Sequence, residues 1–344
     1  MKVAIVGGGL AGCALAHILD FVGAEPVIFE KGPSLASGAS GNSIGLYNPR
    51  FTAERTPQSD YYASAFSAVL RRFSKLEDVD WNPSGALHLI NDEKKKKRFY
   101  QTVDSWGWMP ETMNIVDADA ASEIAGVELR HEAMYLPQSG SVSPVKLCRA
   151  YTAGVDFHLN APDEAWRDIN ADAVVLACGP AVREYLPDLP IGTVRGQITE
   201  VEASEKSSEI KTAICYGGYM SAPVNDMHIV GSTFQRWLDH SDLIEQDDVD
   251  NMNKMAAHIS GMEEGLNIIG SRASVRATSQ DHFPIVGKAP ANDLGIDNLY
   301  VSAAHGSHGI LSTFMAAKLL TDMITDRPYS LSMDTVSALS PGRF

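Results

Sequence analysis

Three observations predict an α/β fold with two kinds of β-sheet. First, an apolar run at residues 2–6 is followed by a glycine-rich turn, a helical pattern and a second apolar run at residues 27–29, which indicates two buried parallel strands joined by a helix. Second, residues 172–179 and 299–303 form further apolar runs followed by glycine-containing turns, and we expect them to join the same sheet. Third, residues 191–235 alternate with short turns between them, which is typical of antiparallel strands.

The order of these segments predicts a discontinuous arrangement. We expect a Rossmann-like domain with a parallel sheet from residues 1–80, 140–190 and 280–344, and an inserted antiparallel-sheet substrate domain from residues 81–139 and 191–279. A chain of 344 residues has room for two domains of ordinary size. The remaining periodic segments predict a helix over 57–76, a strand over 133–136, a helix opened by Ser143 and Pro144, and an exposed acidic helix over 247–260.

The first thirty residues contain the pattern of a dinucleotide site. Gly7, Gly9 and Gly12 form a Gly-x-Gly-x-x-Gly motif between strand and helix, which allows a sharp turn, a close approach of a pyrophosphate and tight helix packing. Glu30 ends the second strand, where a carboxylate can accept hydrogen bonds from ribose hydroxyls. The alternative is an ordinary strand–helix–strand unit in which the glycines only make turns. We expect cofactor contacts from Gly7, Gly9, Leu10, Ala11, Gly12, Glu30 and Lys31.

Two later loops predict further cofactor contacts. Residues 31–50 are rich in Gly, Ser and Asn, and their N–H groups can line a pyrophosphate or an aromatic ring system. A flexible linker is the alternative, but the apolar Ile44, Leu46 and Tyr47 argue against it. Residues 304–309 precede a helix near Ile310, whose N-terminus carries free N–H groups and partial positive charge. The predicted contacts are Ala39, Ser40, Asn42, Gly45, Leu46, Gly179, His305, Gly306, Ser307, His308, Gly309 and Ile310; the alternative for both histidines is capping of the loop.

Composition limits the function classes. The net charge of −15 opposes general binding to nucleic acid or acidic membranes, and no apolar run reaches 18 residues, so we expect no membrane association. The four cysteines contain no CxxC pair, so we expect no metal site and reduced thiols in a cytoplasmic protein. Residues 94–98 form a basic run on a predicted helix. This run is either a solvated helix face or a contact to a polyanion such as tRNA.

Taken together with Arg195-Gly196-Gln197, Arg276 and the stretch 278–287, these motifs make nearly the whole sequence resemble the D-amino acid oxidase-like flavoproteins, which include glycine oxidase and sarcosine oxidase. More narrowly, residues 38–42, 194–197, 278–287 and 338–344 resemble the FAD-dependent oxidoreductase half of the bifunctional tRNA 5-methylaminomethyl-2-thiouridine biosynthesis proteins. Those proteins also carry an N-terminal methyltransferase domain, whereas this sequence opens directly on the glycine motif. Residues 155–171 are shorter than is usual in the family.

The resemblance implies FAD and oxidation of an amine next to a carboxylate. Hydride would leave the α-carbon, and water would hydrolyse the resulting imine. Non-covalent attachment is expected, because no cysteine follows Cys215. Arg276 matches the family's carboxylate-binding arginine, and Tyr219 matches the tyrosine that helps to hold the carboxylate. The alternatives are a surface arginine in a salt bridge and a half-buried strand tyrosine.

Several hypotheses remain open from the sequence. The favoured one is oxidation of an N-substituted glycine, by resemblance the carboxymethylaminomethyl group of a tRNA wobble uridine, with release of glyoxylate. The alternative is an oxidase or dehydrogenase of a free small amino acid such as glycine or sarcosine. A flavoprotein that mainly binds a methyltransferase partner, and an NAD dehydrogenase, are further alternatives. The partner expected under the first hypothesis is tRNA, and a methyltransferase is the partner expected for a flavoprotein that mainly binds.

Overall fold

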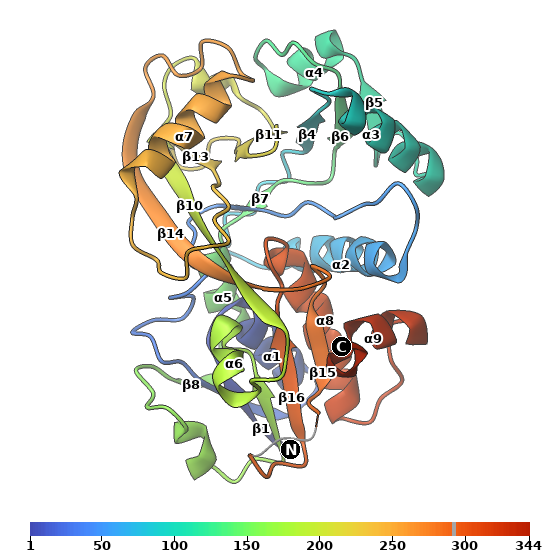
Figure 1. Cartoon of the computed structure of the whole chain (residues 1–344), viewed down its shortest axis with the longest axis vertical. Helices are drawn as coiled ribbons and strands as arrows, with labels where there is room; N and C mark the ends of the chain where they lie inside the picture. The colour runs from blue at the N-terminus through green and yellow to red at the C-terminus, as the bar shows by residue number, and fades with distance from the viewer. Residues whose placement is uncertain (291–293) are drawn as a thin grey trace.

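The computed structural model describes residues 1–290 and 294–344 and has two lobes, each built on a sheet (Figure 1). The six-stranded sheet has the order β15-β16-β9-β1-β2-β8. All neighbouring strands in it are parallel except β15 and β16, which are antiparallel. Its strands are β1 (Lys2–Val6), β2 (Glu25–Phe29), β8 (Asp156–His158), β9 (Ala173–Leu176), β15 (Ile285–Lys288) and β16 (Leu299–Ala303).

Side chains of successive residues in these strands point to opposite faces of the sheet and pack into two hydrophobic cores, one on each face. Val3 and Ile5 of β1 pack into one hydrophobic cluster, and Ala4 and Val6 pack into another. Because successive strand residues point to opposite faces, the wholly apolar runs are explained by a sheet covered on both sides. The first cluster includes residues of α1 (Leu10–Phe21), α2 (Pro57–Phe73), α5 (Pro144–Tyr151), α8 (Gly309–Ile324) and α9 (Met333–Leu339), and the second includes α6 (Val182–Tyr185).

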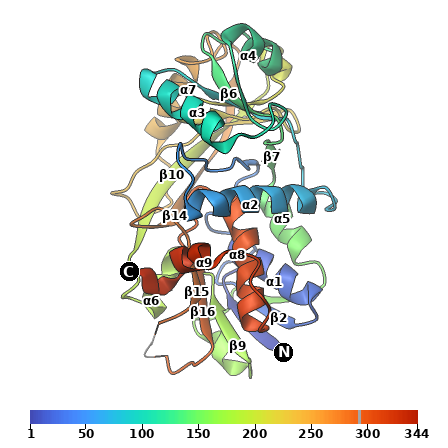
Figure 2. The ribbon, with the colours of Figure 1, turned by 90° about the vertical axis from the view of Figure 1, so that its right-hand side faces the viewer.

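The second sheet has eight strands in the order β14-β10-β13-β12-β11-β4-β6-β5. Its strand pairs are antiparallel apart from β11 and β4, which run parallel. In Figure 2, α2 lies between the upper lobe, which is built on this sheet, and the lower lobe, which is built on the six-stranded sheet. The strands are β4 (Ala86–Leu89), β5 (Asn114–Val116), β6 (Ala133–Leu136), β10 (Ile191–Glu202), β11 (Ala213–Cys215), β12 (Tyr219–Met220), β13 (Met227–Gly231) and β14 (Asn267–Ser279), with α3 (Glu93–Trp106), α4 (Ala118–Ala125) and α7 (Glu245–Ala256) in the same lobe.

Two strands connect the lobes. β10 and β14 pair along almost their whole lengths, from Ile191 opposite Ser279 to Glu202 opposite Asn267. They run from the lower lobe into the upper one (Figure 1). A third, two-stranded sheet pairs β3 (Gly45–Leu46) with β7 (Ser141–Val142). The predicted domain boundaries stay a prediction, although every strand of the two large sheets falls within the segments assigned to its sheet.

Most predicted elements are present, with one correction. Thr56 caps α2 and Ser143 caps α5, each through its side chain. The acidic helix begins at Glu245 and ends at Ala256, and it is not exposed all round, because Asp247 and Asn251 are buried. These polar side chains bind polar groups of β10, which an acidic pattern does not reveal. No helix in the described ranges is long and apolar enough to cross a membrane.

Candidate functional site

A cavity of about 580 Å³ extends across the meeting point of the two lobes. Its walls come from both ends of the chain, from the loop after β2, and from β12 and β14. Except for Gly12, every residue predicted to contact cofactor or substrate lines it. These are Gly7, Gly9, Leu10, Ala11, Glu30, Lys31, Ala39, Ser40, Asn42, Gly45, Leu46, Gly179, Tyr219, Arg276, His305, Gly306, Ser307, His308, Gly309 and Ile310.

The glycine motif is required by local geometry. Gly7 has φ +113°, and a Cβ on it would lie 2.6 Å from the carbonyl oxygen of Ala177. Gly12 lies on α1 directly against the carbonyl oxygen of Gly7, so no side chain fits there. Gly12 therefore serves the packing of α1 on the sheet rather than the cavity wall. Gly9 lines the cavity beside the first turn of α1, and a Cβ on it would lie 3.1 Å from Oγ of Ser40.

The carboxylate of Glu30 organises the glycine turn. It accepts the backbone N–H of Gly8 over 2.7 Å and that of Gly32 over 2.6 Å. The hydroxyl of Ser37 donates to the same carboxylate over 3.0 Å. A carboxylate has about four acceptor positions, so one remains for an outside donor. The neighbouring Lys31 pairs with Asp163 over 3.3 Å at the surface end of the cavity.

The loop of residues 31–50 is fixed rather than flexible. Ser40 Oγ accepts the N–H of Leu10 over 2.9 Å, which joins this loop to the start of α1. Arg272 of β14 donates to Asn42 Oδ1 over 3.1 Å and to the carbonyl oxygen of Ser37 over 3.2 Å, and it also binds that of Gly38. Arg272 is not among the site residues predicted from the sequence. The one indication in the sequence is that Arg272 lies in the predicted substrate domain, four residues before Arg276.

The C-terminal loop brings a second helix N-terminus to the cavity. Gly309 and Ile310 begin α8 and line the wall, and the helix has no side-chain cap. His305 is braced by Ser302 Oγ over 3.1 Å and Ser312 Oγ over 2.9 Å. Burial lowers the pKa of His305 to about 3, so its ring is neutral. These contacts correspond to loop capping, the structural alternative for this histidine.

Arg276 of β14 also lines the cavity, and it has no acidic partner among the described residues. Nη2 of Arg276 donates to Ser232 Oγ over 3.3 Å, and its Cζ lies 5.2 Å from the ring centre of Phe234. Nη1 is buried and has no hydrogen-bond partner within the described chain. Burial lowers the pKa of Arg276. A buried guanidinium is costly unless it is paired, so this group is suited to an anion that enters the cavity.

Tyr219 stands beside this guanidinium. Burial raises the pKa of Tyr219 to about 12, while the charge of Arg276 opposes the rise. The hydroxyl therefore keeps its proton at neutral pH and can donate a hydrogen bond. Asn48, which the sequence analysis passed over at the end of the 31–50 loop, also lines the cavity, and its Oδ1 is buried without a partner in the described chain.

Comparison with known proteins gives consistent findings. A sequence model of the DAO family, described as FAD dependent oxidoreductase, matches residues 2–323. The tRNA 5-methylaminomethyl-2-thiouridine biosynthesis bifunctional protein MnmC of Chromobacterium violaceum is 31% identical over 99% of this chain, and that of Idiomarina loihiensis is 29% identical over 99%. The chain spans 59% and 58% of the lengths of these relatives.

Solved structures resemble this one over nearly the full chain. Glycine oxidase from Geobacillus kaustophilus has a TM-score of 0.83 at 21% identity, with 100% of this chain and 99% of that chain covered. Iminodiacetate oxidase from Chelativorans sp. BNC1 has a TM-score of 0.81 at 19% identity, with 98% of each chain covered. At these identities the likeness concerns the fold.

Proposed function

Because the chain belongs to the DAO family of FAD-dependent oxidoreductases, we propose that it oxidises the C–N bond of an N-substituted glycine. The observation that carries this proposal is the guanidinium of Arg276, a residue that lines the cavity and has no acidic partner in the described chain. The finer proposal is that the glycine unit is a carboxymethylaminomethyl group on the wobble uridine of a tRNA. In that case the carboxymethyl arm leaves as glyoxylate.

FAD is the cofactor, and the residues of the cavity fit it. Gly7 and Gly9 line the cavity and carry no side chain of their own, and the start of α1 would offer N–H groups to a pyrophosphate there. Glu30 would accept a ribose hydroxyl. Gly309 and Ile310 would face the flavin ring at the start of α8 and favour negative charge on it.

The chain's own residues would bind and align the substrate. Bound FAD would supply the two-electron acceptor. Arg276 would hold the substrate carboxylate with its planar guanidinium, and the Tyr219 hydroxyl would donate to the same carboxylate. Holding the carboxylate would restrict the orientation of the α-carbon in the cavity, and alignment of this kind lowers the barrier of the reaction.

Two comparisons support an N-substituted glycine as the substrate class. Iminodiacetate, named in one structural neighbour, is itself glycine with a carboxymethyl group on nitrogen. The relatives named for tRNA modification match along 99% of this chain. The likeness to glycine oxidase supports the alternative substrate, a free small amino acid. The net charge of −15 also favours this alternative, because it opposes binding of a polyanionic tRNA.

A basic surface next to the cavity supports the tRNA-borne substrate. Lys95 of α3 donates to the carbonyl oxygen of Tyr216 over 3.4 Å, and Lys254 of α7 donates to that of Gly217 over 2.6 Å. Gly217 lines the cavity. The predicted basic run lies in the first turns of α3, where Lys94, Lys97 and Arg98 are exposed and Lys96 pairs with Glu132 over 2.8 Å. Lysines beside the cavity-lining Gly217 would contact phosphates of a polynucleotide.

Anaerobic mixing of the FAD-loaded protein with each substrate tests the proposal. Glycine, sarcosine, iminodiacetate and tRNA bearing the carboxymethylaminomethyl group are added separately, and the flavin absorbance is followed with an assay for glyoxylate. We expect bleaching by the tRNA and glyoxylate in equal amount. Bleaching by glycine or sarcosine alone would establish the alternative, and bleaching by none would overturn the proposed reaction.

A further inference from the structure

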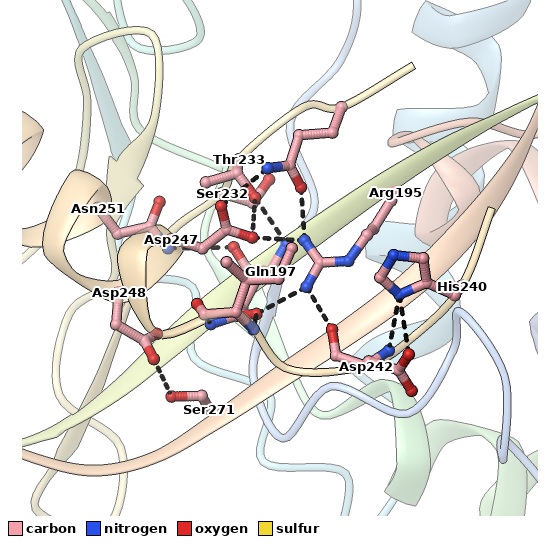
Figure 3. A network of polar contacts seen from close by, with 12 residues as sticks. Arg195, Gln197, Ser232, Thr233, His240, Asp242, Asp247, Asp248, Asn251 and Ser271 are labelled. Atoms are coloured by element: carbon pink, nitrogen blue, oxygen red, sulfur yellow. Dashed lines mark hydrogen bonds and ion pairs between the residues drawn. The ribbon is translucent and has the colours of Figure 1, made fainter. Parts of the chain in front are cut away.

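The segment Arg195-Gly196-Gln197 in β10 lies in a buried polar network that the proposed reaction does not use directly (Figure 3). Resting on the proposed function, we propose that this segment positions the guanidinium of Arg276. Arg195 and Gln197 fix the chain between β13 and α7, and Gly196 leaves the space that the guanidinium occupies. Gly196 is thereby a residue that determines specificity for a carboxylate.

Arg195 is the centre of the network. Its side chain is fully buried, and Nη1 donates to Gln235 Oε1 over 2.5 Å and also pairs with Asp247. Nη2 donates to Gln197 Oε1 over 2.9 Å and to the carbonyl oxygen of Asp242 over 2.5 Å. Gln235 and Asp242 belong to the connection between β13 and α7, and Asp247 belongs to α7. One side chain therefore holds this connection at two points and the first turn of α7 at a third.

Gln197 holds the same connection at both ends. Its side chain accepts the N–H of Ile244 over 2.9 Å and donates to the carbonyl oxygen of Ile244 over 2.9 Å. Its backbone N–H donates to Thr233 Oγ1 over 3.0 Å, and its carbonyl oxygen accepts the N–H of Thr233 over 3.1 Å. The residues at the start of the connection consequently have a fixed place relative to β10.

The first residues after β13 include the two that contact Arg276. Ser232 accepts its hydrogen bond, and Phe234 lies under its guanidinium. Both residues also line the cavity. The network around Arg195 thus sets the position of the surfaces between which the guanidinium lies.

Gly196 supplies the space on the opposite face of the strand. Side chains of successive strand residues alternate, so Arg195 and Gln197 share one face and Gly196 looks to the other. A Cβ on Gly196 would lie 2.8 Å from Cζ of Arg276 and 2.6 Å from the carbonyl oxygen of Thr233. Both distances are shorter than real Cβ contacts, so any side chain here would displace the guanidinium.

The matched pair Gly196→Ala and Gly192→Ala tests this inference. Gly192 lies on the same strand, and a Cβ there would lie 3.6 Å from Thr278 Cγ2, an ordinary contact. Neither glycine has a backbone conformation that excludes alanine. Acetate is titrated into each FAD-loaded protein, and its dissociation constant is read from the flavin absorption spectrum. We expect Gly196→Ala to weaken acetate binding at least tenfold, with FAD content equal to that of Gly192→Ala.

A double-mutant cycle separates positioning from general damage. In an Arg276→Ala background, adding Gly196→Ala should change acetate binding no further and should lower the melting temperature less than in the wild type. Three outcomes would each overturn the inference. Gly196→Ala could bind acetate with wild-type affinity, the change could affect acetate binding equally in both backgrounds, or the wild-type protein could fail to bind acetate. Because the titration needs no turnover, failure of the proposed reaction is recognised separately, by unbleached flavin in the wild type.

Discussion

Ser232 Oγ accepts a hydrogen bond from Nη2 of Arg276 over 3.3 Å, whereas Nη1 of the same guanidinium has no partner in the described residues. One terminal nitrogen is thus satisfied by the protein, whereas the other is buried beside Gly196 without a partner, in a residue that lines the cavity. An arginine in this state distinguishes carboxylates from neutral groups, because only an anion offsets the cost of its burial.

Arg276→Ala should therefore remove substrate recognition without removing the cofactor. Hydrogen bonds to charged groups contribute about 1.5–3 kcal/mol each, so the loss of two lowers the second-order rate constant of flavin reduction by about 10²-fold or more. Anaerobic stopped-flow measurements give this constant. Arg130→Ala, at an exposed arginine, is the control. Reduction of the Arg276 variant at the wild-type rate would remove this residue from the site.

Tyr219→Phe should weaken binding while leaving the pH dependence unchanged between pH 7 and 10. Burial raises the pKa of Tyr219 to about 12, so its hydroxyl keeps its proton throughout this range. Loss of one donor to a carboxylate should raise KM about tenfold. Profiles of kcat/KM against pH for both proteins provide the comparison. A wild-type limb near pH 9–10 that disappears in the variant would contradict the assignment.

Glu30→Gln should weaken FAD binding. The charge on this carboxylate strengthens its bonds to the N–H groups of Gly8 and Gly32, and neutralising it loosens the turn that faces the pyrophosphate. We expect the dissociation constant of FAD to rise about 10-fold to 100-fold, as measured by equilibrium dialysis. Glu25→Gln, at the exposed start of β2, serves as the matched control. Equal affinities for the two variants would show that Glu30 has no part in the cofactor site.

The protein should lose stability in mild acid through its buried histidines. Burial lowers the pKa of His305 to about 3 and that of His308 to about 4, from an ordinary 6.5. Between these values the unfolded chain binds protons that the folded chain does not, so the free energy of unfolding falls as pH falls from about 7 toward 4. Urea titrations at pH 7, 6 and 5 measure the slope, which should be smaller in His305→Asn. A slope that His305→Asn leaves unchanged would mean that this histidine does not contribute to it.

Local signals made much of the fold and of the candidate site predictable. Wholly apolar runs identified the central strands because both faces of that sheet are covered, and the glycines of the first motif have steric reasons contained within a few residues. Arg272 could not be found in this way, since its partners Ser37 and Asn42 lie far away in sequence. The buried face of α7 was missed for the same reason: Asp247 reads as a surface acid until its partner Arg195 is located.

The paired strands β10 and β14 span both lobes without interruption in their pairing, apart from one register shift after Glu200. A continuous ladder of this length resists bending, so the lobes should not open and close about each other as rigid bodies around a flexible joint. Entry and exit of the reactant must then depend on side chains and turns at the cavity's edge. A bulky macromolecular reactant would have to extend only its modified arm inward, with the remainder staying outside.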